Sequence, residues 1–379
     1  MMLPLALTLA TALFPRPQGD PVADWSEDVM ELVSALERMH PDPFAGCPQA
    51  DFEQGVDEFL GGLEGASEAQ ATVELMRLMA RLSLGGREGH ATVWPMASKS
   101  LPLRLYSFDD GWFVVDASSA QREWIGARVL TLGGTPIEEV CARLAPLLTR
   151  DNDWNLRDKL ANALSCVDVL VGVGICPDPE HLTLELERDG ARRSLVLAAE
   201  PGHPHLAFPL PQRKEEPWLA GHDKAFAWQV LEPEHALYVQ FNEVTAAANG
   251  RTLADFAAEV VRTFEERKLA RLIVDVRANG GGDNTTFGPL IQALQSPAID
   301  RPGILFGLIG RHTFSAAGNF VTVLQRDTKA ILLGEPTGGA PNQYGDARDV
   351  ALPHHPRILV RIATRYHSFG GPQDKRLTH

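Results

Sequence analysis

Ser315 has the neighbours that a nucleophilic serine needs. It lies in Thr-Phe-Ser-Ala-Ala-Gly at 313–318, between an apolar run at 304–309 that predicts a buried strand and a run at 320–324 with helical spacing. A hydroxyl at a helix N-terminus lies beside unpaired backbone N–H groups and the positive end of the helix dipole. This arrangement suits acyl transfer, although a serine at such a position is more commonly an ordinary N-cap.

A glycine-rich turn follows another apolar run. Residues 272–276 predict a buried strand, and Arg-Ala-Asn-Gly-Gly-Gly-Asp at 277–283 follows it directly. Glycine has no Cβ, so its backbone N–H can come close to a reacting group. Two N–H donors aimed at one point form an oxyanion hole, which stabilises the charge of a tetrahedral intermediate. Turn and serine together indicate a hydrolase.

His90 is the candidate for the base that a serine nucleophile requires. It lies in Gly-Gly-Arg-Glu-Gly-His-Ala-Thr-Val-Trp at 85–94, a glycine-rich bend that enters a predicted strand. A single histidine in such a bend is more often structural than catalytic. Its distance of 225 positions from Ser315 (315 − 90) is no objection, because serine–histidine pairs form in space.

Three blocks of this sequence resemble the signature blocks of one serine peptidase family. They are Arg-Leu-Ile-Val-Asp-Val-Arg-Ala-Asn-Gly-Gly-Gly at 271–282, Thr-Phe-Ser-Ala-Ala at 313–317 and Gly-Glu-Pro-Thr-Gly-Gly at 334–339. The family contains the tail-specific (C-terminal processing) proteases and the tricorn-type core proteases. The blocks occur in the family's order and at similar spacing, and the resemblance covers mainly residues 235–379.

The resemblance implies Ser315 as nucleophile and His90 as general base. Tricorn-type members carry an Asp-Gly-His-Thr block, and the match here is Glu-Gly-His-Ala-Thr at 88–92, with Glu in place of Asp and Ala91 before the threonine. The tail-specific branch uses a lysine in a block like Thr-Phe-Gly-Lys-Gly. Here Ala340 stands at that place, and Lys329 lies before the third strand, at its wrong end. The chain is therefore nearer the tricorn-type branch.

Further residues are expected to assist this pair. The resemblance implies the backbone N–H groups of Gly281 and Ala316 as oxyanion donors, with Gly280 as the fallback. Residues 342–344 (Asn342, Gln343 and Tyr344) are candidates to line the pocket.

Three acids are candidates to orient the His90 ring, and the sequence does not choose among them. Glu88 is two residues away, so that both side chains share one side of an extended segment. Glu335 belongs to the Gly-Glu-Pro-Thr block, where it could simply hold the loop. Asp374 lies near the place where tricorn-type enzymes carry a late acidic residue.

The predicted fold class is α/β. The order of strands and helices after residue 226 argues for a sheet with packed helices, and the resemblance implies a crotonase/Clp-like α/β sandwich. Residues 126–140 and the hairpin around 188–190 are similar to parts of a PDZ domain. The predicted division is a possible leader at 1–20, a helical subdomain at 21–98, a β-rich PDZ-like subdomain with a helical insertion at 99–200, a proline-rich linker at 201–225 and a catalytic domain at 226–379.

Composition bounds the remaining properties. A hydrophobic content of 44% and a net charge of −14 indicate a globular protein with no sign of nucleic-acid binding. Cys47, Cys141, Cys166 and Cys176 have no metal-site spacing, so the four are expected to be free buried thiols, or to include one bridged pair, of which Cys166 and Cys176 are nearest in sequence. No metal and no organic cofactor is expected.

The first residues resemble part of a signal peptide. The apolar run at 1–14 has the length of a signal-peptide core and is too short to span a bilayer, but it lacks a preceding Lys or Arg. This favours export to the periplasm or exterior over a cytoplasmic location, and no segment is expected to span a membrane.

The sequence thus predicts a serine peptidase that acts on peptides or proteins through an acyl-enzyme. Two alternatives remain: a hydrolase of non-peptide esters or amides on the same site, and a non-catalytic peptide-binding protein. The oligomeric state is not predicted.

Overall fold

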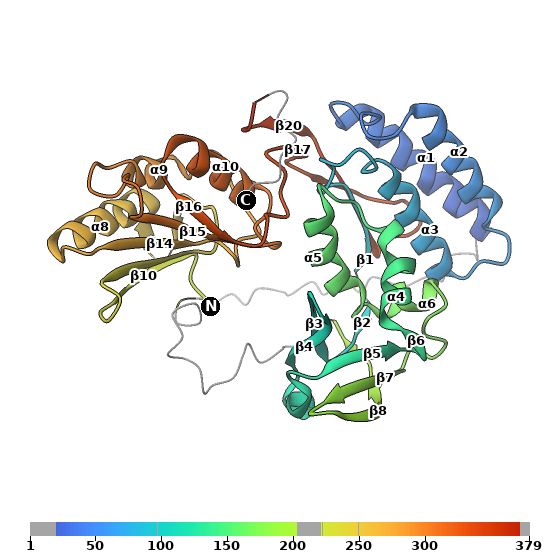
Figure 1. The fold of residues 1–379 in the computed structure, drawn as a ribbon. Helices are drawn as coiled ribbons and strands as arrows, with labels where there is room; N and C mark the ends of the chain where they lie inside the picture. The colour runs from blue at the N-terminus through green and yellow to red at the C-terminus, as the bar shows by residue number, and fades with distance from the viewer. Residues whose placement is uncertain (1–19, 97, 203–220, 222, 249, 372–379) are drawn as a thin grey trace, which may run out of the picture.

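The computed structural model describes residues 20–96, 98–202, 221, 223–248 and 250–371. The possible leader up to residue 19, nearly all of the linker and Asp374 lie outside these ranges. The described residues form two hydrophobic cores, which correspond to the two lobes in Figure 1. Within these ranges, no helix combines the length and the apolar character that crossing a bilayer requires.

Three helices begin the first lobe: α1 (Pro21–Met39), α2 (Gln49–Gly61) and α3 (Glu68–Arg81). Val29, Leu32 and Leu36 of α1 are almost fully buried, as their three- and four-residue spacing predicts. Helix α3 starts with a capping box, in which the side chains of Ser67 and Gln70 each accept from the other's backbone N–H. These three helices lie within the range 21–98 of the predicted helical subdomain, whose bounds remain a prediction.

The second part of the first lobe is a six-stranded sheet. Its order is β3-β4-β5-β7-β8, with β6 paired to β5, and all pairs are antiparallel. Three helices, α4, α5 and α6, lie between β6 and β7 in sequence. The bounds are β3 (Leu103–Phe108), β4 (Gly111–Ala117), β5 (Arg128–Leu132), β6 (Thr135–Pro136), α4 (Ile137–Leu144), α5 (Asp153–Ala163), α6 (Val167–Gly172), β7 (His181–Arg188) and β8 (Ala191–Ala198).

The second lobe contains the predicted strand–turn–helix order. A five-stranded sheet runs β10-β11-β14-β15-β16, in which β10 is antiparallel to β11 and the other pairs are parallel. Helices α8, α9 and α10 cover one face of it (Figure 1), and their apolar side chains form the second core with the strands. The bounds are β10 (Phe226–Leu231), β11 (Ala236–Phe241), α8 (Leu253–Glu266), β14 (Arg271–Asp275), α9 (Gly288–Leu294), β15 (Leu305–Ile309), α10 (Ala316–Asp327) and β16 (Ile331–Gly334).

After β16 the chain returns to the first lobe. Strands β17 (Asn342–Gly345) and β20 (Arg365–Ser368) pair with each other and lie between the lobes in Figure 1. Strands β18 (Arg348–Val350) and β19 (Ile358–Ile362) form a sheet with β1 (Thr92–Pro95), in the order β1-β19-β18. Val360 and Ile362 belong to the first core. The division at residue 226 remains a prediction, but strands from the last part of the chain pack in the first lobe.

The four cysteines are reduced. Cys47, Cys141, Cys166 and Cys176 are all free and buried, which decides between the two expectations for them.

The remaining elements are short. They are β2 (Lys99–Ser100), β9 (Glu200–Pro201), β12 (Ala247–Ala248), β13 (Arg251–Thr252) and the 3₁₀ turns η1 (Ser119–Trp124) and η2 (Ala145–Leu147).

The contribution of the returning strand β19 to the first core can be measured. Ile362 is fully buried and Ile331 of β16 is 43% exposed. Ile362→Ala should lower the free energy of unfolding by about 2–5 kcal/mol, because it leaves a cavity in a packed core. Ile331→Ala, the matched control, should cost less than about 1 kcal/mol. Urea unfolding followed by tryptophan fluorescence measures both, and equal losses would contradict this packing.

Candidate active site

The carboxyl ends of β14 and β15 bring the glycine turn next to the serine segment. The two strands are parallel neighbours, so the loops that follow them leave the same edge of the sheet. Thr313 Oγ1 donates to the carbonyl of Val276 at 2.8 Å, and the Phe314 N–H donates to the carbonyl of Asn279 at 3.2 Å. These bonds fix the segment before Ser315 on the glycine turn.

Ser315 has a strained backbone at the point where the chain enters α10. Its φ is +53° and its ψ is −128°, a backbone region that residues other than glycine rarely adopt. Ser315 occupies the N-cap position, as the sequence predicts, but its side chain makes no capping hydrogen bond. The hydroxyl is therefore turned away from the helix and is available for another partner.

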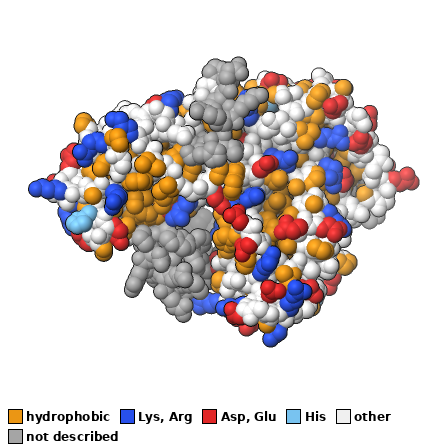
Figure 2. All heavy atoms as spheres, in the orientation of Figure 1, with side chains coloured by type: hydrophobic (Ala, Val, Ile, Leu, Met, Phe, Trp, Pro, Cys, Tyr) orange, Lys and Arg blue, Asp and Glu red, His pale blue; other side chains and the backbone are white. Residues whose placement is uncertain are grey.

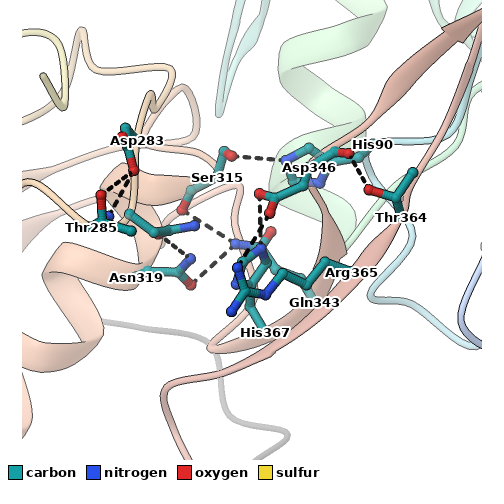
Figure 3. Close-up of polar contacts among 11 residues, drawn as sticks. His90, Asp283, Thr285, Ser315, Asn319, Gln343, Asp346, Thr364, Arg365 and His367 are labelled. Atoms are coloured by element: carbon teal, nitrogen blue, oxygen red, sulfur yellow. Dashed lines mark hydrogen bonds and ion pairs between the residues drawn. The ribbon is translucent and has the colours of Figure 1, made fainter.

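That partner is His90. Its Nε2 lies 2.8 Å from Ser315 Oγ, and Figure 3 shows the two side chains meeting from opposite lobes. The His90 ring also stacks on Phe314, with ring centroids 4.5 Å apart and planes 27° apart. The structure thus brings together the two residues on which the sequence prediction depends, at a distance suited to proton transfer.

His90 is neutral in this arrangement. Burial, together with the neighbouring charges of Lys159 and His367, lowers its pKa to about 3, although the backbone of Tyr344 and the carboxylate of Asp346 oppose the shift. The Nδ1 atom is shielded from solvent and has no well-formed hydrogen bond within the described residues. A neutral ring with a free lone pair at Nε2 can accept the serine proton.

Glu88 does not orient His90 here. Its Oε2 lies 2.7 Å from Nε2 of His40, and its Oε1 accepts the N–H of Ala91 at 3.1 Å. Both carboxylate oxygens of this buried side chain are therefore occupied, and the expectation that proximity in sequence would bring it to the ring is corrected. Its role is to hold the bend that carries His90.

Glu335 is also engaged elsewhere. It forms an ion pair with the buried Arg311, whose Nε donates at 2.7 Å, and it accepts from Tyr106 OH at 3.1 Å. It holds its loop, which is the alternative expected for it from the sequence. The third candidate, Asp374, lies outside the described residues and stays a prediction.

The glycine turn lies against the serine as expected, with one difference. A Cβ on Gly281 would come within 2.7 Å of Ser315 Cβ and 3.2 Å of the Ala316 nitrogen, so only glycine fits there. The Gly281 N–H, however, donates to Asn279 Oδ1 at 2.9 Å. No hydrogen bond between described residues uses the N–H of Ala316 or of Gly280. These two are the open donors, and Gly281 shares its N–H with Asn279.

A chain of amides supports the serine from below (Figure 3). Gln343 Nε2 donates to the Ser315 carbonyl and to Asn319 Oδ1, both at 3.2 Å, and Asn319 Nδ2 donates to Asn284 Oδ1 at 2.8 Å. Sequence reasoning placed Gln343 near the pocket but gave no role to Asn319. Because Asn319 lies one helical turn after Ser315, its i+4 spacing was the available signal.

The other basic candidates lie away from Ser315 Oγ. Nδ1 of His312 lies 3.0 Å from Asp158. Lys329 precedes β16, at the amino end of the parallel sheet, and Ser315 follows the carboxyl end of β15. The Ala340 N–H, at the place of the tail-specific lysine, donates to Asp151. This geometry excludes Lys329 as the base in this arrangement.

Two further features of the described residues bear on the site: potential metal ligands and a cavity near the pair. The described residues contain no cluster of three or more His, Cys, Asp or Glu side chains that could hold a metal ion. A cavity of about 250 Å³ lies nearby, between β1 and the segment 147–149, but neither Ser315 nor His90 lines it.

Fold and site together define an α/β protein with a serine–histidine pair at the carboxyl edge of a parallel sheet. The chain has the fold of CPAF: the structure of mature CPAF complexed with lactacystin matches with a TM-score of 0.64 and 14% identity over 90% of each chain. A serine-to-alanine mutant of CPAF matches with a TM-score of 0.66 and 13% identity, over 94% of this chain and 91% of that one.

The photosystem II D1 C-terminal processing protease aligns over 92% of this chain and 89% of its own, at 15% identity, but its TM-score of 0.40 is too low to support a conclusion about fold. No protein-family model and no curated protein sequence matches this chain. The resemblance to the tail-specific protease family is confirmed by the neighbours at the level of the fold.

The protonation state of His90 can be tested directly. Because burial lowers its pKa to about 3, the ring should stay neutral from about pH 8 to about pH 5, the range in which an ordinary histidine gains its proton. His312 should behave in the opposite way, because its hydrogen bond to Asp158 raises its pKa. Histidine ring NMR signals across this range measure both, and a His90 signal that titrates with that of His312 would contradict the burial argument.

Proposed function

We propose that this chain is a serine peptidase that hydrolyses peptide bonds in peptide or protein substrates through an acyl-enzyme. The observation that carries the proposal is the 2.8 Å contact between His90 Nε2 and Ser315 Oγ, formed at a strained N-cap beside a glycine turn. The fold is similar to that of mature CPAF in complex with lactacystin, and this similarity supports the proposal.

The proposed reaction uses each group once per step. Ser315 Oγ attacks the substrate carbonyl carbon while His90 Nε2 takes the hydroxyl proton, and the carbonyl oxygen becomes an oxyanion. The N–H of Ala316 and the glycine turn, through Gly281 or Gly280, donate to this oxyanion. His90 then gives the proton to the leaving amine as the C–N bond breaks. In the second stage, water attacks the acyl-enzyme while His90 takes its proton, and His90 returns this proton to Ser315 Oγ as the ester bond breaks.

The finer detail of the architecture around this site is also a proposal, based on the resemblance to the family. The sheet of the second lobe with its helices is the core of a crotonase/Clp-like sandwich, and the antiparallel sheet from β3 to β8 is a PDZ-like unit with an inserted helical segment. Support comes from the parallel order of β11, β14, β15 and β16 and from the β7–β8 hairpin. An edge of that unit would take an extended peptide as an added strand.

The surface agrees with a peptide rather than a nucleic-acid partner. The net charge is −14, and in Figure 2 acidic and basic side chains are interspersed on the visible face without a large continuous basic area. Binding to the phosphate backbone would need clustered Lys and Arg.

Substitution of the reacting pair tests the proposal. Ser315→Ala and His90→Ala should each lower kcat against a fluorogenic peptide library by about 10⁴- to 10⁶-fold, because the two act as one unit. Lys329→Ala is the control and should leave kcat unchanged, since Lys329 lies at the opposite end of the sheet. Labelling by a fluorophosphonate probe without turnover of any peptide would favour an ester or amide hydrolase. Peptide binding without labelling would favour a non-catalytic binding protein.

The glycine turn offers a second test with a matched control. Gly281→Ala should lower kcat about 100-fold or more, because its Cβ would displace Ser315 from the oxyanion donors. Gly303→Ala introduces the same methyl at another positive-φ glycine, where nothing lies within 4 Å. Both variants carry backbone strain, so a kcat for Gly303→Ala near that of the wild type isolates the effect of the close contact. Equal losses in both would remove the turn from the mechanism.

A further inference from the structure

Two oppositely charged side chains form hydrogen bonds with the backbone of the residue that precedes His90. The Gly89 N–H donates to Asp151 Oδ1 at 2.6 Å, and the Gly89 carbonyl accepts from Lys159 Nζ at 2.6 Å. Both peptide groups of Gly89 are therefore held by charge-assisted hydrogen bonds, which are about twice as strong as neutral ones. We propose that Asp151 and Lys159 are positioning residues that fix His90 on Ser315 through the backbone of Gly89. This inference rests on the proposed function.

The space around Gly89 does not accommodate a side chain. A Cβ there would come within 2.8 Å of Asn155 Oδ1, 2.9 Å of Asp151 Oδ1 and 3.0 Å of the Phe314 ring. Phe314 is the residue on which the His90 ring stacks. Asp151 and Lys159, called the clamp from here on, thus act where the histidine bend lies against Phe314 of the serine segment.

Lys159 also reaches the residue that follows His90. Its Nζ donates to the carbonyl of Thr149 at 2.7 Å and to Thr149 Oγ1 at 3.1 Å, and Thr149 Oγ1 donates to the carbonyl of Ala91. The ammonium group therefore has three acceptors for its three protons. Through them it holds the chain on both sides of His90.

Asp151 connects the same bend to the other lobe. Its Oδ2 accepts the N–H of Ala340 at 3.2 Å. The adjacent Gly339 N–H donates to the carbonyl of Thr313 at 3.1 Å, and a Cβ on Gly339 would come within 3.2 Å of the Ser315 nitrogen. One carboxylate thus joins the loop that carries the base to the loop that packs on the nucleophile.

The electrostatics of the pair agree with a positional role. Burial raises the pKa of Asp151 to about 7 and lowers that of Lys159 to about 8. The charge of each residue opposes the shift of the other. Two opposite charges that are taken out of water in this way add little to stability on balance, and such groups can instead specify geometry. Displacing a catalytic group by about 1 Å costs about 100-fold in rate.

The test measures kcat, KM and probe labelling for Asp151→Asn, Lys159→Met and the double variant, which leaves no unpaired charge. Each should lower kcat about 10- to 100-fold with KM within about twofold, because the base is misplaced while the substrate surface is untouched. Arg251→Met is the control: it removes the ion pair between Arg251 of β13 and Glu259 of α8, in the second lobe. It should leave kcat unchanged.

A double variant with the wild-type kcat would overturn the proposal, while loss of activity in Ser315→Ala would show that the proposed function still stands. If the double variant does not fold, Thr149→Val removes only the bridge from Lys159 to Ala91, and wild-type kcat in that variant would count against the clamp.

One readout does not depend on turnover. The charged and titratable groups that act on the His90 ring are Lys159 from α5, His367 from β20 and Asp346 after β17. Lys159→Met should raise the pKa of His90 and shift its ring NMR signals, and Arg251→Met should not. If the wild-type protein cleaves no peptide and binds no probe, the proposed function fails, and an unchanged His90 spectrum in Lys159→Met would refute the clamp separately.

Discussion

The hydrogen bond between His90 and Ser315 crosses the boundary between two hydrophobic cores. Each side chain is carried by a different lobe, so neither core alone determines their distance. A rate that depends on angstrom-scale placement then depends on how the lobes are joined. The joint is largely polar: besides the link through Asp151, Asn152 Nδ2 donates to the carbonyls of Thr337 and Gly338 at 3.1 and 3.0 Å.

A second polar contact holds the β-rich sheet to the segment before the serine. Arg311, only 2% exposed, pairs with Glu335, donates to Ser107 of β3 and lies over the Tyr106 ring with its guanidinium carbon 4.2 Å from the centroid. Directional contacts of this kind define one arrangement, whereas apolar surfaces tolerate sliding. The polar character of the joint thus matches a site whose two halves must meet in a single geometry.

Sequence reasoning found most of the second lobe because its signals are local. Apolar runs at 272–276 and 304–309 and the glycine turn between them each reflect only their own neighbours, and β14, β15 and α10 formed where they were expected. The pairing of β1 with β19 was not foreseen, since it joins residues more than two hundred positions apart. The sequence could not decide the part of Glu88 for the same reason: its partner His40 lies 48 positions earlier and belongs to no motif. Asp151, just before α5, and Lys159, within it, were missed because a charged residue at such a place is ordinarily solvated.

The electrostatics of His90 explain why the resting site is a neutral pair. A buried ring whose pKa is about 3 does not hold a proton at neutral pH, and Ser315 Oγ can donate its hydrogen to Nε2 without separating charge. Forming the imidazolium beside Lys159 and His367 is costly until a negative charge appears nearby. The oxyanion of a tetrahedral intermediate is such a charge, and it develops within reach of the same serine. In the proposed mechanism, proton transfer to His90 thus becomes favourable when a substrate carbonyl is attacked, and Ser315 keeps its proton while no carbonyl occupies the site.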